Sequence, residues 1–560
     1  MKKYNYAYTV WIYFCKNEYN RFVKGLPHLQ REQGAILFRY LKGNAGTDYG
    51  KKYRFSQINN YEDFVANVPL INDWQQLEEE LNQLQAGKKK VLTAEPVLVF
   101  EETSGSTGFS KLIPYTRSLK AEFGAALDVW MYMLWTQYPA AFKGKSFWAI
   151  SPALKAKRQT PSGIKIGMDS DLEYLNPIGA MVMNSVLAVR QEKLPTGDKD
   201  AFFTGCLVQL LLNESLSFIS IWSPNYFLVL DAFLRSNFVV ILKEVAMHSA
   251  KRAEALCLLD KQQFTWKEIW PHLALISCWT EAQAAMWLGA VHQKSGGILV
   301  QGKGLMSTEA VCSIPFGEAG KTLLAYRSHF FEFRELDATR ILSAPDLDLN
   351  ILLKGKNVLS APEFGKDELD KVAKILRAHE LEIGGLYEVI LSTGSGLMRY
   401  ASGDMVEVTG KEKSVPYLSF KGRVGANCDL VGEKLHENHL MAALLEVWSK
   451  EMYGIEGVFF YPEKSTDGVH YVLALEMEKL PHLLAQKLVQ TEAVLCKNPY
   501  YLQAIKSGQL QALTCKIVAA GSSKKIKQHI QSARSIKEGD FKMPLLLKDP
   551  NLIDLLNEQK

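Results

Sequence analysis

The stretch TSGSTGFSK, residues 103–111, combines small and hydroxylated residues with one lysine. Backbone N–H groups in such a loop can approach an anion closely and Lys111 adds a point charge, so phosphate is the favoured ligand. A Walker A loop would read G-x-x-x-x-G-K-[ST] and continue into a helix. Gly105, Gly108 and Lys111 are spaced differently, and the residues after Lys111 predict a strand, which disfavours a P-loop nucleotidase. A surface turn rich in Ser and Gly is the alternative.

Four later segments carry further groups that could act on a phosphorylated substrate. They are LMSTEA (305–310), the strand-rich GGLYEVILSTGSGLMRYASGDMVEV (384–408), the glycine-containing KGRVGANCDLVGEKL (421–435) and the lysine turn GDFKMP (539–544). Together they offer carboxylates, hydroxyls and cations.

In this order the five segments resemble the motifs of the GH3 acyl acid amido synthetases, a branch of the adenylate-forming enzymes. One such motif is weak, but five in order are specific, and the resemblance covers almost the whole chain. Acyl-CoA ligases and peptide-synthetase adenylation domains have a similar phosphate-binding loop but lack the sequence pattern GLYEV…RYxxGD. This pattern favours the GH3 branch.

The resemblance implies a ligase that joins a carboxylic acid to ATP, releases pyrophosphate and transfers the acyl group to an amine, commonly an amino acid. It implies ATP and Mg²⁺ as cofactors and a small-molecule carboxylic acid and an amino acid as partners. Two alternatives stay open: an acyl-CoA or carrier-protein ligase of the same superfamily, and a non-catalytic nucleotide-binding regulatory protein.

The resemblance assigns phosphate contacts to Ser104, Gly105, Ser106 and Thr107, with Lys111 closing the loop. An exposed turn hydroxyl is the alternative for each of the hydroxylated residues.

The second motif places Ser307 and Thr308 at the nucleotide, with Thr308 on the α-phosphate and Glu309 as a ligand of Mg²⁺. A hard divalent cation prefers oxygen ligands and substrate phosphates. Alternatively, Thr308 and Glu309 begin a helix as its cap and first-turn acid.

In the third motif Asp404 should accept hydrogen bonds from both ribose hydroxyls, because a carboxylate offers two acceptor oxygens to a vicinal diol. A β-turn aspartate is the alternative. Arg423 is a second candidate for the ribose or the phosphates, or else a surface arginine at a hinge. Lys434 resembles the lysine that approaches the adenylate from the smaller domain, or else is a solvated lysine.

Lys542 matches the family's late lysine, which stabilises the charge between carboxylate and α-phosphate during adenylation. We therefore expect Lys542, Thr308 and Glu309 to be the catalytic residues. The chain departs from the family at Leu305, often an aromatic residue, and at Ala401, often an arginine. These departures weaken any transfer of substrate identity.

The alternation of strands and helices predicts a layered α/β fold, and the resemblance implies the firefly-luciferase-like adenylating type. A large N-terminal α/β domain with a small barrel-like sheet should span residues 1–422, and a smaller α+β lid should span 423–560. Strands are expected at VLVFEE (97–102) and KLIPYT (111–116) around the first loop.

Two strand-to-helix units are expected within the large domain. After SFISIW, Ser223 should cap a helix that has Pro224 at its first position. After LALISCW, Thr280 and Gln283 should form a capping box. The acyl pocket is expected near these units, with candidate lining residues Tyr132, Trp135, Trp222 and Tyr326.

Composition bounds the class of protein. A net charge of +5 over 560 residues is mild, so no nucleic acid partner is expected. The eight cysteines show no C-x-x-C and no partnering His spacing, so they suggest neither a zinc site nor a disulfide framework and fit a reducing cytosol. No uncharged apolar run approaches the roughly 20 residues that cross a bilayer. We therefore expect a cytoplasmic monomer without a membrane partner.

Overall fold

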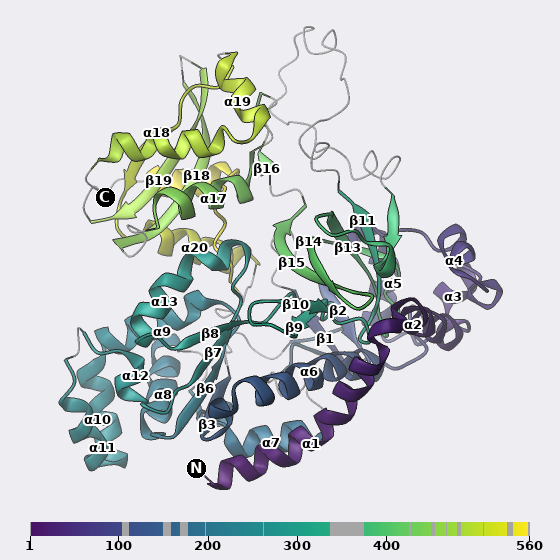
Figure 1. The fold of residues 1–560 in the computed structure, drawn as a ribbon, viewed down its shortest axis with the longest axis horizontal. Coiled ribbons are helices and arrows are strands. Elements are labelled where there is room, and N and C mark those ends of the chain that lie inside the picture. The colour runs from purple at the N-terminus through teal and green to yellow at the C-terminus, as the bar shows by residue number, and fades with distance from the viewer. Residues whose placement is uncertain are drawn as a thin grey trace.

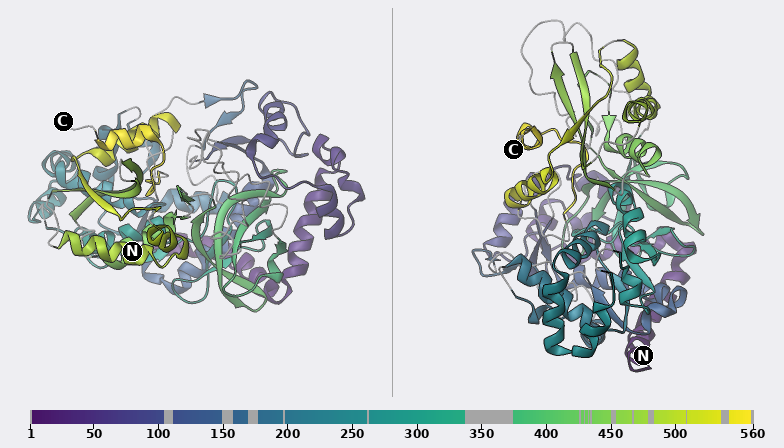
Figure 2. Two further views of the ribbon diagram at one scale, coloured as in Figure 1. Left: turned by 90° about the horizontal axis from the view of Figure 1, so that it is seen from above. Right: turned by 90° about the vertical axis from the view of Figure 1, so that its left-hand side faces the viewer.

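The computed structural model describes most of the chain, in the following ranges: 2–103, 111–148, 158–168, 177–195, 198–260, 263–336, 374–424, 427–428, 430–431, 433, 435–449, 454–465, 468–478, 483–507, 509–534 and 541–557. A large N-terminal part carries a smaller C-terminal part on one side, as the two views of Figure 2 show.

The N-terminal segment is helical. Its long helix α1 (Lys2–Gly25) lies along α6 (Arg117–Gln137) in Figure 1 and buries Trp11 and Cys15 against it. The shorter helices that follow are α2 (Leu29–Asn44), α3 (Asp48–Lys52), α4 (Tyr61–Asn67) and α5 (Glu78–Gln85).

A four-stranded parallel sheet forms the centre of the large part. Its strands lie in the order β3 (Lys145–Trp148), β6 (Leu216–Ser220), β7 (Leu275–Cys278) and β8 (Leu299–Gly302). Alternate residues feed two cores, because successive side chains of a strand point to opposite faces. Phe218 packs in the core with α6, whereas Ile219 packs in the core with the helices of the other face.

Helices cover both faces of this sheet (Figure 1). They are α7 (Pro177–Val186), α8 (Lys199–Leu212), α9 (Pro224–Ser236), α10 (Phe238–His248), α11 (Ala250–Cys257), α12 (Trp266–Ile269) and α13 (Leu288–Ser295). The predicted start of α9 is confirmed: Ser223 accepts a hydrogen bond from the N–H of Asn225 and Pro224 is the first helical residue. This places the end of β6 directly before a helix N-terminus.

The loop 103–111 joins two antiparallel strands, β1 (Val99–Glu102) and β2 (Leu112–Tyr115), as predicted. They belong to a second four-stranded sheet with the short strands β5 (Lys165–Ile166) and β4 (Arg158–Gln159). The residues after Lys111 therefore continue as a strand and not as a helix.

A seven-stranded antiparallel sheet forms the other half of the large part, in agreement with the small sheet predicted beyond residue 380. Its strands lie in the order β12 (Ile375–Arg377), β11 (Phe330–Glu335), β13 (Leu386–Ser392), β14 (Tyr400–Glu412), β15 (Val415–Arg423), β10 (Thr322–Leu324) and β9 (Ser313–Pro315). Arg423 is the last residue of β15, so the predicted boundary at 422 and 423 falls at the end of this sheet. The assignment of residues 423–560 as a separate lid domain stays a prediction.

The C-terminal part is an α+β unit. A two-stranded ribbon of β16 (Asn427–Cys428) and β17 (Leu435–His436) leads into a sheet of β18 (Ile455–Ser465), β19 (Gly468–Met477) and β20 (Thr514–Val518). Its helices are α17 (Glu437–Val447), α18 (Leu484–Leu495), α19 (Pro499–Lys506), α20 (Ser522–Arg534) and α21 (Pro550–Asn557).

Among the described helices, none is by itself long and apolar enough to cross a membrane. The consecutive helices α9 and α10 would pass such a test only as a pair, and they are bent by 83° at their junction.

Candidate functional site

The base of the first loop is closed by backbone hydrogen bonds. The Thr103 N–H donates to the Lys111 carbonyl at 2.9 Å, and the Lys111 N–H donates to Thr103 Oγ1 at 3.1 Å. Ser104, Gly105, Ser106 and Thr107 lie outside the described residues. Their phosphate contacts therefore stay a prediction, but the two ends of the loop are held together.

The Lys111 side chain extends from the base of this loop to Tyr400, the first residue of β14. Its ammonium donates to Tyr400 Oη at 2.5 Å and lies 5.9 Å from the ring centroid of Trp74. Burial raises the pKa of the Tyr400 hydroxyl, and the nearby Glu309 carboxylate raises it further. Tyr400 is therefore a neutral phenol that links the first motif to the second.

The segment 305–310 is a tight hairpin turn. A bridge joins Met306 to Val311, the Ser307 N–H donates to the Ala310 carbonyl at 2.9 Å, and Tyr115 Oη donates to the Thr308 carbonyl at 2.6 Å. The alternative that Thr308 begins a helix is wrong, because its carbonyl accepts from Tyr115 of β2 and the turn ends at Val311, shortly before β9 (Ser313–Pro315).

Glu309 follows on the same turn and is buried, with 8% of its surface exposed. Its charge acts on Tyr400, Cys312 and Arg423. Within the described residues no three His, Cys, Asp or Glu side chains gather as a metal cage.

Asp404 and Arg423 face each other on neighbouring strands β14 and β15. Arg423 Nε lies 3.4 Å from Asp404 Oδ1, and Arg423 Nη2 donates to the Ser402 carbonyl at 2.5 Å. Burial lowers the pKa of the Arg423 guanidinium, but the charges of Asp404 and Glu309 outweigh it and leave that pKa raised. The alternative of a β-turn aspartate is wrong, since Asp404 lies inside a strand.

Gly403 shapes the backbone beside this pair. Its φ of +80° is one that L side chains rarely adopt, and a Cβ there would lie 3.4 Å from Arg423 Nη2. The Gly403 N–H donates to Glu388 Oε1 at 3.1 Å, and the Asp404 N–H donates to Ser402 Oγ at 3.0 Å. The Gly-Asp order of the motif is therefore explained by backbone geometry as well as by charge.

Lys542 is carried by the C-terminal part but contacts the large part through aromatic rings. Its Nζ lies 4.3 Å from the ring centroid of Trp279 and 5.9 Å from that of Phe420, which is on β15 three residues before Arg423. Lys434, the other lysine predicted from this part, lies outside the described residues.

Backbone hydrogen bonds fix the segment that follows Lys542. The N–H groups of Leu545 and Leu546 donate to Glu437 Oε1 at 3.0 and 2.9 Å, and the Phe460 N–H donates to the Leu545 carbonyl at 2.7 Å. The lysine turn is thereby tied to the first helix and the first long strand of its own unit.

The capping box predicted at Thr280 is wrong. The 3₁₀ helix Ala282–Trp287 has Glu281 as its N-cap, without a side-chain cap hydrogen bond, and α13 begins only at Leu288. Burial raises the pKa of the Glu281 carboxyl, which hydrogen-bonds to Ser419 of β15. Contact with the neighbouring sheet has replaced the local cap.

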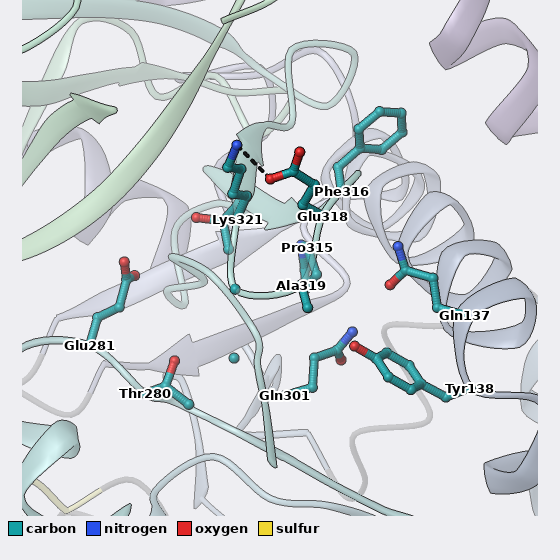
Figure 3. Close-up of a pocket in the computed structure, with 13 residues that line it drawn as sticks. Gln137, Tyr138, Thr280, Glu281, Gln301, Pro315, Phe316, Glu318, Ala319 and Lys321 are labelled. Carbon is teal, nitrogen blue, oxygen red and sulfur yellow. Dashed lines mark ion pairs between the residues drawn. The ribbon is translucent and has the colours of Figure 1, made fainter. Parts of the chain in front are cut away.

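A polar pocket lies between the end of the parallel sheet and the β9–β10 hairpin (Figure 3). Gln301 and Glu281 reach it from the parallel-sheet side, and the ion pair of Lys321 with Glu318, 2.9 Å apart, closes the hairpin side. The full lining is Gln137, Tyr138, Thr280, Glu281, Gln301, Gly302, Pro315, Phe316, Glu318, Ala319, Gly320, Lys321 and Thr322.

Sequence reasoning missed a buried lysine directly after β8. Lys303 is 2% exposed, and its Nζ lies 4.6, 5.7 and 5.0 Å from the ring centroids of Trp130, Trp148 and Trp222. Only Trp222 was predicted near the acyl pocket. We call these four residues the tryptophan cage; no motif signals it, because its members come from four separate segments.

The other predicted pocket residues have structural roles. Tyr326 is fully buried and donates its hydroxyl to the Phe22 carbonyl. Tyr132 packs on Tyr19 with ring centroids 4.4 Å apart, and Trp135 packs edge-on against a core phenylalanine. The Tyr132–Tyr19 contact joins α6 to α1.

Family models match three consecutive parts of the chain. Residues 18–247 match the GH3 family N-terminal domain, residues 322–423 the GH3 family central domain, and residues 438–551 the GH3 family C-terminal domain. The chain belongs to the GH3 family. The resemblance drawn from five short motifs is thereby confirmed over most of the length.

Individual GH3 proteins are distant in sequence but similar in length. The probable indole-3-acetic acid-amido synthetase GH3.2 of Oryza sativa subsp. japonica is 21% identical, over 94% of this chain and 90% of the rice protein. The indole-3-acetic acid-amido synthetase GH3.15 of Arabidopsis thaliana is 20% identical, over 74% of this chain and 72% of its own length.

A solved GH3 structure, described as AtGH3.15 acyl acid amido synthetase in complex with 2,4-DB, superposes with a TM-score of 0.78. The match covers 96% of this chain and 95% of that one at 16% sequence identity. The predicted α/β adenylating fold, with its large N-terminal part and smaller α+β C-terminal part, is confirmed.

Proposed function

We propose that this GH3 protein is an ATP-dependent acyl acid amido synthetase. It would activate a small carboxylic acid as an acyl adenylate and transfer the acyl group to an amine, with an amino acid as the expected acceptor. The names of the two amido synthetase relatives support the amide-forming class, and the geometry of this chain supports the activation step.

The observation that carries the proposal is one electrostatic cluster built from motifs far apart in the sequence. Lys111 of the first loop donates a hydrogen bond to Tyr400. The charge of Glu309 raises the pKa of Tyr400 and of Arg423, and Arg423 lies against Asp404. If these ion pairs only stabilised the fold, there would be no reason for the first loop, the hairpin turn 305–310 and the Gly-Asp segment of β14 to lie together. ATP binding requires this combination of anion donors and ribose acceptors.

In the proposed first step a carboxylate oxygen of the acid attacks the α-phosphorus of ATP. The bond from the α-phosphorus to the bridging oxygen breaks, and pyrophosphate leaves with that electron pair. Thr308 would donate to the α-phosphate and Lys542 would stabilise the charge shared between carboxylate and phosphate. Such aimed charges are the largest single contribution in many enzymes.

In the second step the neutral amine nitrogen attacks the acyl carbonyl carbon. The bond from this carbon to the AMP oxygen breaks, AMP leaves as the phosphate anion, and the nitrogen loses a proton to form the amide. Lys542 lies over rings of the large part but belongs to the C-terminal part, so a movement of the C-terminal part would carry it away between the steps.

Glu309 is the residue that would hold Mg²⁺, together with phosphate oxygens of the nucleotide. The ion would supply positive charge to the departing pyrophosphate. Asp404 is the residue that would hold the ribose, with Arg423 orienting its carboxylate.

A pyrophosphate-release screen that crosses carboxylic acids with amino acids tests this proposal. We expect release that requires both ATP and an acid, and amide formation with at least one amino acid or with hydroxylamine. Product formation with coenzyme A in place of amines would assign the chain to the thiol ligases. Absence of acid-dependent release over a broad panel would overturn the enzymatic assignment.

A further inference from the structure

A fully buried histidine holds one end of the hairpin turn 305–310. His329 is the residue before β11, and its Nε2 accepts a hydrogen bond from the Val311 N–H at 3.2 Å. The neighbouring Ser328 donates its hydroxyl to the Val311 carbonyl at 3.0 Å. Because Val311 forms the bridge with Met306 that closes the turn, two adjacent side chains hold both backbone polar groups at this end of it.

The hydrogen bond from Val311 fixes the tautomer of this histidine. A ring nitrogen that accepts from a backbone N–H carries no proton, so the proton of the neutral imidazole is on Nδ1. Nδ1 lies 3.1 Å from Glu122 Oε2 and donates to it. Glu122 lies on α6 and is 6% exposed, so this hydrogen bond is buried. The protein therefore engages both ring nitrogens of His329, and neither is left to act as a general base.

Glu122 also holds the turn between β13 and β14. Its Oε2 accepts from the Gly394 N–H at 2.9 Å. A Cβ on Gly394 would lie 2.4 Å from Glu122 Oε1 and 2.7 Å from Ser118 Cβ, so only glycine lets the backbone approach this closely. The Gly394 carbonyl accepts from Thr116 Oγ1, directly after β2, at 3.1 Å. One carboxyl group therefore connects the strand after the first loop with the turns of the second and third motifs.

Further hydrogen bonds to the same group come from α2, which packs against β11 (Figure 1). Tyr40 donates its hydroxyl to Glu122 Oε1 at 2.8 Å. Gln33, which is 4% exposed, donates to the His329 carbonyl at 2.7 Å and accepts from the Phe331 N–H at 2.8 Å. The same helix therefore holds the backbone of His329 and the partner of its ring, which restricts the movement of the imidazole.

We propose that Glu122 and His329 are positioning residues for the adenylation step, and we call them the positioning pair. Glu122 fixes the tautomer and the direction of the imidazole. His329 Nε2 then holds the turn so that Thr308 and Glu309 can act on the nucleotide. This inference rests on the proposed function, because that function assigns the turn to the nucleotide. A displacement of the turn by about 1 Å is enough to slow a reaction by up to about 10²-fold.

Two substitutions at His329 separate its two hydrogen bonds. His329→Gln places an amide near the position of Nε2 and keeps an acceptor for the Val311 N–H, whereas His329→Asn places it near Nδ1 and keeps only a donor to Glu122. The assay contains ATP and the acid with the highest rate in the pyrophosphate-release screen. We expect His329→Gln to stay within about threefold of wild type and His329→Asn to be at least about tenfold slower. Equal rates in the two folded variants would overturn the proposal.

The second half-reaction separates positioning from a merely structural role. The chemically synthesised acyl adenylate of the same acid bypasses the first step, so His329→Asn should convert it to the amide within about threefold of the wild-type rate. Equal slowing of both half-reactions would assign His329 a structural role and overturn the proposal. The control His470→Asn removes another buried histidine beside a glutamate, 3.4 Å from Glu463 in the C-terminal part, and should leave both rates unchanged.

A second pair of variants tests Glu122 without requiring the histidine variants to fold. Glu122→Gln keeps an oxygen that accepts from His329 Nδ1 and the Gly394 N–H. Its amide nitrogen then faces Tyr40, whose hydroxyl can donate to the Ser328 carbonyl, 3.5 Å away. Glu122→Met has a similar length and no acceptor. We expect pyrophosphate release within about threefold of wild type in Glu122→Gln and at least about tenfold slower in Glu122→Met; equal rates would count against the positioning pair.

Hydrogen exchange separates this inference from the proposed function. In the full-length protein without nucleotide, deuterium uptake at the Val311 amide should be at least about tenfold faster in His329→Asn and unchanged in His329→Gln, because only the first variant removes the acceptor of that N–H. This difference in a protein that releases no pyrophosphate would support the hold on the turn and overturn the synthetase. Acid-dependent pyrophosphate release with equal exchange and equal rates in both variants would support the synthetase and overturn the positioning pair.

Discussion

The electrostatic cluster around Asp404 and the tryptophan cage each hold a cation, but different groups contact it in the two regions. Arg423 lies against the carboxylates of Asp404 and Glu309, so its charge is compensated within the protein. Lys303 lies among indole rings and donates to a serine hydroxyl. Carboxylates therefore contact the first cation, whereas aromatic rings and a hydroxyl contact the second.

The two regions also differ in how the chain builds them. Asp404 and Arg423 sit on adjacent antiparallel strands at directly opposed positions, so strand register alone brings them together. The cage draws its side chains from α6 and from the ends of three parallel strands. Strand pairing is sufficient to bring Asp404 to Arg423, whereas packing of the whole parallel sheet is needed to bring the cage residues together.

The largest effect is expected from the lysine that lies between the two regions. Lys542→Ala should lower the rate of acid-dependent pyrophosphate release by roughly 10²–10³, as for other groups aimed at developing charge. ATP binding should persist, because the electrostatic cluster around Asp404 is untouched. Lys497→Ala, which removes a surface partner of Glu446, is the matched control and should act like wild type. Equal rates in both variants would remove Lys542 from the first step.

A substitution in the Asp404–Arg423 ion pair should affect only the binding of the nucleotide. Asp404→Asn removes one charge from the pair and weakens the ribose acceptor, so the KM for ATP should rise about 10- to 100-fold. Glu407→Gln is the control, because Glu407 pairs with Lys421 across the same two strands but at the surface. Exposed pairs of this kind are worth at most about 1 kcal/mol. Similar effects of the two substitutions would contradict a special role for Asp404.

A smaller effect is expected from the hydrogen bond between Lys111 of the first loop and Tyr400. Tyr400→Phe removes the hydroxyl that accepts from Lys111 and should raise the KM for ATP about fivefold, close to the roughly 1 kcal/mol of one hydrogen bond. The preference among carboxylic acids should not change. A shift in acid preference would show that the first loop also acts on the binding of the acid.

The smallest effect concerns the junction between the large and C-terminal parts. The His436 N–H donates to His439 Nδ1 at 3.2 Å, and burial lowers the pKa of His439 to about 4. Below pH 6.5 this imidazole is therefore protonated in the unfolded chain but stays neutral in the folded chain. The free energy of unfolding decreases as pH falls from 6.5 towards 4.

Between pH 7 and pH 6 this histidine should cost about half a kcal/mol of the free energy of unfolding. Urea denaturation of wild type and of His439→Asn at both pH values measures it. The asparagine keeps an acceptor but does not titrate, so its loss of stability should be smaller by that amount. Parallel behaviour of the two proteins would assign the pH dependence to other groups.

The sequence alone determined the features that depend on local geometry. Strands β1 and β2 around the first loop and the Ser223 cap before Pro224 are confirmed, because turn and cap chemistry is complete within a few residues. The five motifs likewise identified the family, since each motif is contiguous. Thr280 failed as a cap because its neighbour Glu281 is held by the adjacent sheet, which no local pattern reveals.

Only the tertiary structure decided which of these groups meet. It put Asp404 in a strand opposite Arg423, tied the Thr308 turn to Tyr115, and laid Lys542 over Trp279 from the other part of the chain. The cage around Lys303 had no local signal, because its rings approach one another only when α6 packs across the ends of the parallel strands. Contacts between distant segments depend on how whole layers pack, and that information is spread over the entire sequence.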